Sequence, residues 1–178
     1  MTGLLDLHPA ADRPDLLAEP VAAAVAAHPA LDVRVAEIDP DLADTAAFCE
    51  RYEVSLDVSA NCVVVAGRRG GDTRYAACVV LATTRADVNG VVRRRLDARK
   101  ASFAPMDDAV ALTGMEYGGI TPLGLPADWL LLVDAAVAAT PFVVVGSGVR
   151  RSKLVLPGAA LGTLPDAEVV DGLASPVA

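Results

Sequence analysis

Apolar and polar residues alternate along several short segments of the chain, which is the pattern of half-buried strands. Leu31, Val33 and Val35 alternate with polar residues within 31–38. Val-rich runs at 61–67 and 75–82 flank a polar, glycine-containing link at 68–73, and we predict that these two runs form a β-hairpin. Further strands are expected at 101–104, 130–133, 142–146 and 153–156.

Other segments repeat their apolar residues at the spacing of a helix. Asp44 and Asp87 precede two such segments and suit the N-cap position. Gly114 is placed to end a helix that begins near Pro105 and has Val110 on its inner face. Helices are expected at 14–27, 44–51, 87–96, 105–113, 135–139 and 157–164. Because helices and strands interleave around a hairpin, the sequence predicts an α/β fold with a mixed sheet.

Length and composition favour a single domain over residues 1–178. Of the 178 residues, 53% are hydrophobic, which is enough to bury a core. No apolar run approaches the ~20 residues that cross a bilayer, and residues 1–6 lack the features of a secretory signal. We therefore expect no membrane association and a cytoplasmic location. Cys49, Cys62 and Cys78 are well separated and are expected to be buried free thiols.

The sequence lacks the common catalytic and cofactor motifs. His8 and His28 are the only histidines, and each precedes a proline in the acidic N-terminal part, so a Ser-His or Cys-His nucleophile is not expected. Gly146-Ser147-Gly148 follows a Val-rich run but lacks the third glycine and the helix of a dinucleotide-binding turn. We expect neither a metal nor an organic cofactor. Any hydrolysis would rest on backbone donors, substrate groups and bound water.

The most informative segment is a glycine-rich loop, Gly118-Gly119-Ile120-Thr121-Pro122-Leu123-Gly124. Adjacent glycines let main-chain N–H groups approach a ligand closely, and the proline stiffens the exit. Such a loop suits a carbonyl or phosphate oxygen, although the same composition also builds ordinary turns. A second motif, Gly146-Ser147-Gly148-Val149-Arg150-Arg151-Ser152-Lys153-Leu154, follows a strand-like run further along the chain.

These two motifs, in this order, resemble those of the YbaK and prolyl-tRNA synthetase-associated editing domain family. The first fits T-G-x-x-x-G-G-[IV]-[ST]-P-x-G from Thr113, and the second fits G-x-G-x-R-x-S-K-L from Gly146. The resemblance runs from about residue 60 to residue 164. It implies a mixed, strongly curved sheet with helices packed outside. It also implies a trans-editing hydrolase that deacylates mischarged aminoacyl-tRNA.

The resemblance also implies a set of site residues. The ester carbonyl would be held by main-chain N–H groups of Gly118 and its neighbours, which makes Gly118 a catalytic residue. Arg150 would place a cation near the terminal phosphate or ribose, or would be a plain surface charge. Leu123 and Leu125 would help to wall a small pocket. The substrate-binding set is Gly119, Ile120, Thr121, Pro122, Gly146, Ser147, Gly148 and Arg150.

Asn61 departs from the family pattern. Many members carry a lysine at the start of the first hairpin strand, in a pattern like A-K-S-L-V-F, and the stretch from Ala60 to Val65 puts Asn61 in that position. Asparagine donates hydrogen bonds but carries no charge. If Asn61 is a second catalytic residue in place of that lysine, we expect the rate of hydrolysis to be about tenfold lower than with the lysine. Asn61 could instead satisfy a backbone group at the strand edge. Cys62 is expected to face the core.

Three functions are therefore compatible with the sequence. The first is a free-standing deacylase. The second is a non-catalytic module that binds aminoacyl-tRNA or aminoacyl-adenosine and has lost the family lysine. The third is a role unrelated to tRNA on the same scaffold, since fold does not fix function.

Charge is distributed unevenly along the chain. The net charge of -8 argues against DNA binding, but residues 68–153 carry twelve Lys and Arg against eight Asp and Glu. This local excess is compatible with docking of the 3′ acceptor end of an aminoacyl-tRNA, or with a solvated charged face. A synthetase or an elongation factor is the further partner that the resemblance leaves open.

Overall fold

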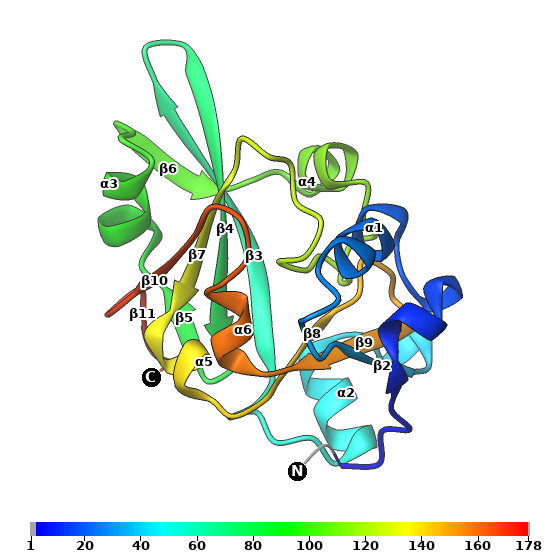
Figure 1. Cartoon of the computed structure of the whole chain (residues 1–178). Helices are drawn as coiled ribbons and strands as arrows, with labels where there is room; N and C mark the ends of the chain where they lie inside the picture. The colour runs from blue at the N-terminus through cyan, green and yellow to red at the C-terminus, as the bar shows by residue number, and fades with distance from the viewer. Residues whose placement is uncertain (1–2, 178) are drawn as a thin grey trace.

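The structure, a computed structural model, describes residues 3–177 as a mixed α/β fold (Figure 1). Its largest sheet has five strands in the order β10-β7-β4-β3-β6. The pairs β10–β7 and β7–β4 are parallel, and the other two pairs are antiparallel. The α/β class predicted from the sequence is confirmed. The five strands are β3 (Ala60–Arg69), β4 (Asp72–Leu81), β6 (Lys100–Phe103), β7 (Leu130–Asp134) and β10 (Ala167–Val170).

A second sheet of four antiparallel strands has the order β1-β2-β9-β8. A single parallel bridge between Ser59 and Val144 joins the two larger sheets. The mixed sheet expected from the sequence is thus divided at this junction. The four strands are β1 (His8–Pro9), β2 (Arg34–Glu37), β8 (Val143–Gly146) and β9 (Ser152–Leu156), and β5 (Thr84–Ala86) pairs with β11 (Ala174–Pro176) in a small third sheet.

The helices begin and end largely at the residues that the sequence marks for them. The Asp87 carboxylate accepts hydrogen bonds from the N–H groups of Gly90 and Val91, and Gly114 ends its helix at a φ of +67°. Asp44 occupies an N-cap position without a side-chain capping bond. The helices are η1 (Ala10–Asp12), η2 (Pro14–Leu16), α1 (Glu19–Ala27), η3 (Pro40–Leu42), α2 (Thr45–Tyr52), η4 (Val88–Val92), α3 (Arg93–Arg95), α4 (Met106–Thr113), α5 (Ala135–Ala139) and α6 (Gly158–Leu161).

The β3–β4 hairpin is the backbone of the larger sheet. Gly70 and Gly71 form its two-residue turn with φ values of +62° and +95°, a conformation that suits the twist of paired strands and that glycine adopts without strain. The strands pair without a bulge from Ala60 opposite Leu81 to Arg69 opposite Asp72. The predicted hairpin is confirmed, and its strands extend further into the link than the sequence indicated.

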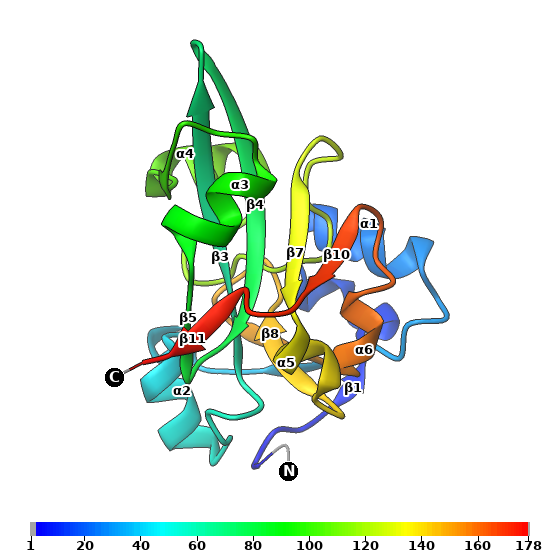
Figure 2. The same cartoon turned by 90° about the vertical axis from the view of Figure 1, so that its left-hand side faces the viewer.

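Alternate residues of β3 face two separate apolar cores. Val64 belongs to a cluster that includes Val21 and Val25 of α1, whereas Val65 packs with Val92 and Leu96 beside α3. Figure 2 shows the long hairpin with α3 against one side and α1 beyond β7 on the other. The hairpin is therefore buried on both faces near β6, while its turn projects away from both cores.

Some element boundaries differ from the prediction. The helix expected at 14–27 is a 3-10 turn followed by α1, because the extended Leu17 and Ala18 separate the two. In α4 the buried residues are Ala109 and Thr113, and Val110 is only half-buried. Strands β1, β5, β10 and β11 were not predicted, since segments of two to four residues carry too little periodicity to be recognised. Within residues 3–177, no helix is both long and apolar enough to span a bilayer.

Candidate functional site

The two glycine motifs lie against each other in the structure. The Glu116 N–H donates to the Gly148 carbonyl at 2.8 Å, and the Gly148 N–H donates to the Gly119 carbonyl at 2.7 Å. A Cβ on Gly146 would lie 2.4 Å from the Gly119 carbonyl oxygen, so only glycine allows this approach. The second motif therefore fixes the shape of the first.

Arg150 clamps the outer side of the glycine loop. Its guanidinium donates to the Pro40 carbonyl at 3.2 Å and to the Tyr117 carbonyl at 3.4 Å, and it lies 3.6 Å from an Asp44 carboxylate oxygen. The main-chain N–H of Arg150 donates to the Glu116 carboxylate at 2.6 Å. Arg150 thus ties three separate segments together, and its guanidinium is already engaged by protein groups.

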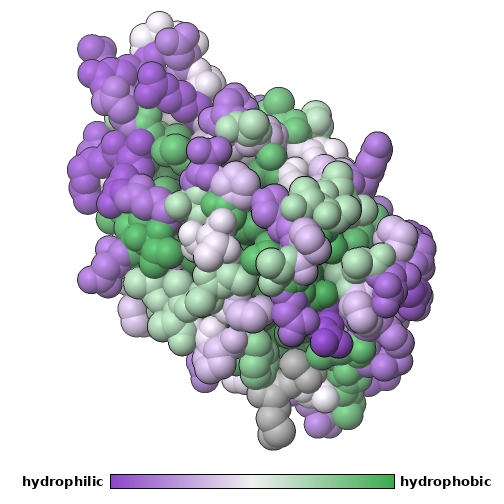
Figure 3. Space-filling model, viewed as in Figure 1, coloured by the Kyte–Doolittle hydropathy of each residue, from purple (hydrophilic) through white to green (hydrophobic). Residues whose placement is uncertain are grey.

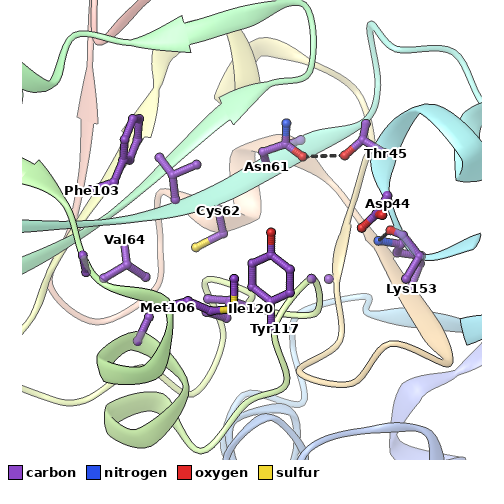
Figure 4. A pocket seen from close by; sticks show the side chains of 17 residues that line it. Asp44, Thr45, Asn61, Cys62, Val64, Phe103, Met106, Tyr117, Ile120 and Lys153 are labelled. Atoms are coloured by element: carbon purple, nitrogen blue, oxygen red, sulfur yellow. Dashed lines mark hydrogen bonds between the residues drawn. The ribbon is translucent and has the colours of Figure 1, made fainter. Parts of the chain in front are cut away.

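A cavity of about 510 Å³ opens beside this loop, which is a size typical of small-ligand sites. Figure 4 shows Asp44, Thr45, Asn61 and Lys153 together at one end, and Val64, Phe103 and Met106 toward the other. The side chains of Phe103, Met106 and Tyr117 are each about half exposed at its margin. The cavity therefore has a polar end, an apolar end and an apolar rim.

Two main-chain amides of the glycine loop are available for a ligand. Gly118 and Ile120 both line the cavity, and among residues 3–177 neither amide donates a hydrogen bond to another protein group. The Gly119 amide, between them, donates to the Glu116 carbonyl at 2.9 Å. Gly118 has a φ of +79°, which a residue with a Cβ avoids. The loop thus has two unpaired amides in residues that line the cavity.

Asn61 lies at the start of β3 in the polar end of the cavity. Its Oδ1 accepts a hydrogen bond from the Thr45 hydroxyl at 2.8 Å, so its amide NH2 is oriented by this contact (Figure 4). Within the described residues the NH2 donates to no protein group. The side-chain amide of Asn61 is therefore fixed in orientation and can donate uncharged hydrogen bonds to a ligand.

Lys153 brings a buried cation to the same end of the cavity. Only 9% of the residue is exposed, and its Nζ donates to the Ala43 carbonyl at 2.8 Å and lies 5.2 Å from the centre of the Phe48 ring. Burial lowers the pKa of Lys153 from 10.5 to about 8, with nearby Arg150 acting in the same direction and Cys49 and Asp44 opposing it. An ammonium has three N–H donors, and within residues 3–177 one of them has a protein acceptor.

Four of the ten predicted site residues line the cavity: Asn61, Gly118, Ile120 and Gly146. The other six do not lie on its surface. Gly119 and Gly148 are buried in the contact between the two motifs, and Arg150 clamps the loop from outside. The Ser147 hydroxyl is fully buried and hydrogen-bonded to Ser152 at 2.7 Å. Thr121, Pro122 and Leu123 are buried in the second half of the loop and do not line the cavity, and Pro122 and Leu125 line a separate pocket.

Thr121 provides a test of this placement. Its hydroxyl is fully buried and has no hydrogen-bond partner among residues 3–177, a state that costs about 1–3 kcal/mol. We expect Thr121→Val, which keeps the shape and removes the hydroxyl, to raise the melting temperature by roughly 2–4 °C per kcal/mol regained. Hydrolytic activity should not change, because the side chain does not reach the cavity. Calorimetry with a parallel activity assay checks both, and lost activity at full stability would contradict the placement.

Several residues that line the cavity are not predictable as site residues from the sequence. Lys153 appears in the sequence analysis only as part of the second motif, because nothing local indicates that a lysine in an apolar strand faces a cavity. Cys62, expected in the core, also lines the cavity, but burial strongly raises the pKa of its thiol and so disfavours a nucleophilic thiolate. Among the described residues no cluster of three His, Cys, Asp or Glu side chains is suited to hold a metal.

Comparison with known proteins supports the resemblance found in the motifs. The aminoacyl-tRNA editing domain family matches residues 39–164, a span that includes the whole cavity. A search of curated proteins gave no match. Among solved structures, the hypothetical protein APE2540 is 22% identical, with a TM-score of 0.76 over 88% of this chain and 100% of that one.

A candidate trans-editing enzyme for prolyl tRNA synthetase is 20% identical, with a TM-score of 0.73 over 86% of this chain and 94% of the other. At these identities the structural matches show the shared fold alone. The family match covers most of the chain and coincides with both glycine motifs. The chain therefore belongs to the aminoacyl-tRNA editing domain family.

Proposed function

We propose that this chain is a trans-editing deacylase that hydrolyses the ester bond of a mischarged aminoacyl-tRNA. One observation carries the proposal. Two unpaired amides of the glycine loop, the free amide of Asn61 and the buried Lys153 ammonium all belong to one cavity. Such a set of fixed donors suits an oxygen on which negative charge develops during ester hydrolysis.

In the proposed reaction the oxygen of a water molecule attacks the ester carbonyl carbon. Charge then develops on the carbonyl oxygen, where the N–H groups of Gly118 and Ile120 donate. The bond between the carbonyl carbon and the ribose oxygen breaks, and the ribose oxygen takes up one proton of the attacking water. The second proton passes to solvent, and the amino acid leaves as its carboxylate. Because an ester is already activated, held donors and an ordered water suffice without a nucleophilic side chain.

The two ends of the cavity suggest how the substrate is oriented. The apolar end, with Val64 and Ile120, suits a small apolar amino-acid side chain. The exposed rings of Tyr117 and Phe103 suit stacking with the terminal base of an RNA single strand. The polar end is left for the ester and ribose oxygens, close to Asn61 and Lys153.

A panel of aminoacyl-tRNAs tests the proposal. We expect hydrolysis of at least one of them well above the uncatalysed rate. We also expect a preference for small side chains, because the bulky side chains of Ile120 and Met106 line the apolar end. Release of labelled amino acid measures the rate. An amide-linked aminoacyl-adenosine, which cannot be hydrolysed in this way, measures binding by calorimetric titration. Binding of the analogue without turnover of any charged tRNA would reject the deacylase and favour a non-catalytic binding module.

A further inference from the structure

Basic residues gather on one part of the surface, at the end of the β3–β4 hairpin and on the adjoining α3 and β6. Residues 68–100 contain nine of the fifteen Lys and Arg of the chain and only three Asp and Glu, a local charge of +6. Since the whole chain carries -8, the remainder carries -14. Figure 3 shows hydrophilic residues gathered over this hairpin end and α3, at the upper left of that view.

Most of these basic side chains are free to meet a ligand. Arg69 forms an ion pair with Asp97, and Arg95 with Glu168. Apart from Arg85 on β5, five further basic residues are exposed and make no ion pair with any residue in the described range 3–177: Arg68, Arg74, Arg94, Arg99 and Lys100. We call these five residues the basic surface. Like charges held together without partners repel one another, which a bound polyanion relieves.

The basic surface is continuous with the cavity through two strands. Arg68 and Lys100 are directly opposite each other in the β3–β6 pairing. Val64, which lines the cavity, lies four residues before Arg68 on the same face of β3, about 13 Å away at ~3.3 Å per residue. Phe103, at the cavity rim, ends the strand that Lys100 begins. A chain of phosphates leaving the cavity can therefore run along this edge.

We propose that the basic surface, with Arg68 and Lys100 at its inner end, binds the sugar-phosphate backbone of the acceptor stem while the 3′ terminus occupies the cavity. The inference rests on the proposed function, because it takes the cavity as the site of the aminoacyl ester. Lys and Arg contacts to phosphates supply most of the sequence-independent affinity for nucleic acids. The acidic remainder of the molecule repels RNA, so it also restricts how the stem can approach.

The test measures RNA binding apart from catalysis. A labelled, uncharged RNA hairpin that carries a tRNA acceptor stem and its single-stranded 3′ end is titrated by fluorescence anisotropy at several salt concentrations. For the double variant Arg68→Ala with Lys100→Ala we expect about tenfold weaker binding at low salt. We also expect the slope of log affinity against log salt to fall by about 1 to 2. The matched control, Arg34→Ala with Arg51→Ala, removes two exposed charges elsewhere and should bind like the parent.

Hydrolysis of a small substrate separates this inference from the proposed function. An aminoacyl ester of adenosine lacks the stem, so the double variant should cleave it at the parental rate while KM for charged tRNA rises. Unchanged hairpin affinity and salt slope in the double variant, or no hairpin binding by the parent, would overturn the inference. Binding of phosphatidylserine vesicles in place of the RNA would overturn it too. If the parent cleaves neither substrate, the deacylase is rejected and the anisotropy result still decides the basic surface.

Discussion

Replacing Gly118 by alanine is expected to lower kcat/KM for aminoacyl-tRNA about 100-fold. A Cβ at this position would lie 2.4 Å from the guanidinium of Arg150, and the backbone would have to leave its φ of +79° or remain strained. Arg150 would then give up its contacts with the Pro40 and Tyr117 carbonyls, and the loop amides would shift. A misplacement of about 1 Å, or the loss of one oxyanion donor, costs on the order of 10² in rate. Steady-state kinetics on charged tRNA measures the effect.

Gly114→Ala is the matched control for this variant. Gly114 has a similar φ of +67° and lies in the same connection, but its nearest neighbour to an added Cβ is 3.9 Å away and it does not line the cavity. Both changes carry the strain of a left-handed residue, about 1–2 kcal/mol, so both should lower the melting temperature similarly. Only Gly118→Ala should lose activity. An equal loss of activity in both variants would attribute the effect to stability and remove Gly118 from the proposed mechanism.

The sequence predicted the parts of this site that local chemistry determines. The hairpin follows from two Val-rich runs around Gly70 and Gly71, and the glycine-rich loop follows from Gly118 and its neighbours, because glycine and β-branched residues bias the backbone wherever they occur. The N-cap role of Asp87 is local in the same way. These predictions needed no knowledge of which segments meet.

Side-chain placement depended on contacts between distant segments, which periodicity does not reveal. Ser147 and Thr121 read as ligand-binding hydroxyls within a motif, yet the packing of the two motifs buries both completely. Arg150 reads as a free cation, but Pro40, more than a hundred residues earlier, supplies a carbonyl that engages it. In each case tertiary packing decides whether a polar group faces a ligand or another part of the protein.

The position of Lys153 could not be predicted from the sequence for the same reason, because its ammonium is held at the cavity by the carbonyl of Ala43, 110 residues earlier. We expect Lys153→Met, which keeps most of the length of the side chain, to lower kcat/KM about 10-fold to 100-fold. That is the range for losing a charge-assisted hydrogen bond of about 1.5–3 kcal/mol. Lys153→Arg keeps a cation and should retain more activity than Lys153→Met. Equal kcat/KM in the methionine variant and the parent would show that Asn61 and the loop amides act without this charge.

The pH dependence distinguishes a functional ammonium from a structural one. The pKa of Lys153 is about 8 in the folded protein, against 10.5 as its ordinary value, so the ammonium loses its proton as pH rises through about 8. If the cation assists hydrolysis, kcat/KM after subtraction of the uncatalysed rate should fall above pH 8. The substrate amine also titrates near this pH, but its contribution remains in Lys153→Arg, whose guanidinium stays charged. The part of the fall due to Lys153 should therefore be absent in that variant.

The free energy of unfolding should rise over the pH range in which kcat/KM falls. Between about pH 8 and pH 10.5 the unfolded chain holds a proton on Lys153 that the folded chain has released, so the free energy of unfolding rises with pH. The rise is about 3 kcal/mol, from a pKa difference of about 2.5 at 1.36 kcal/mol per pKa unit, and Lys153→Met should lack it. A merely structural lysine would leave kcat/KM level while stability increased. The ammonium is assigned to the reaction if activity falls by more than the substrate amine explains while stability rises, and if both effects are absent in Lys153→Arg and Lys153→Met.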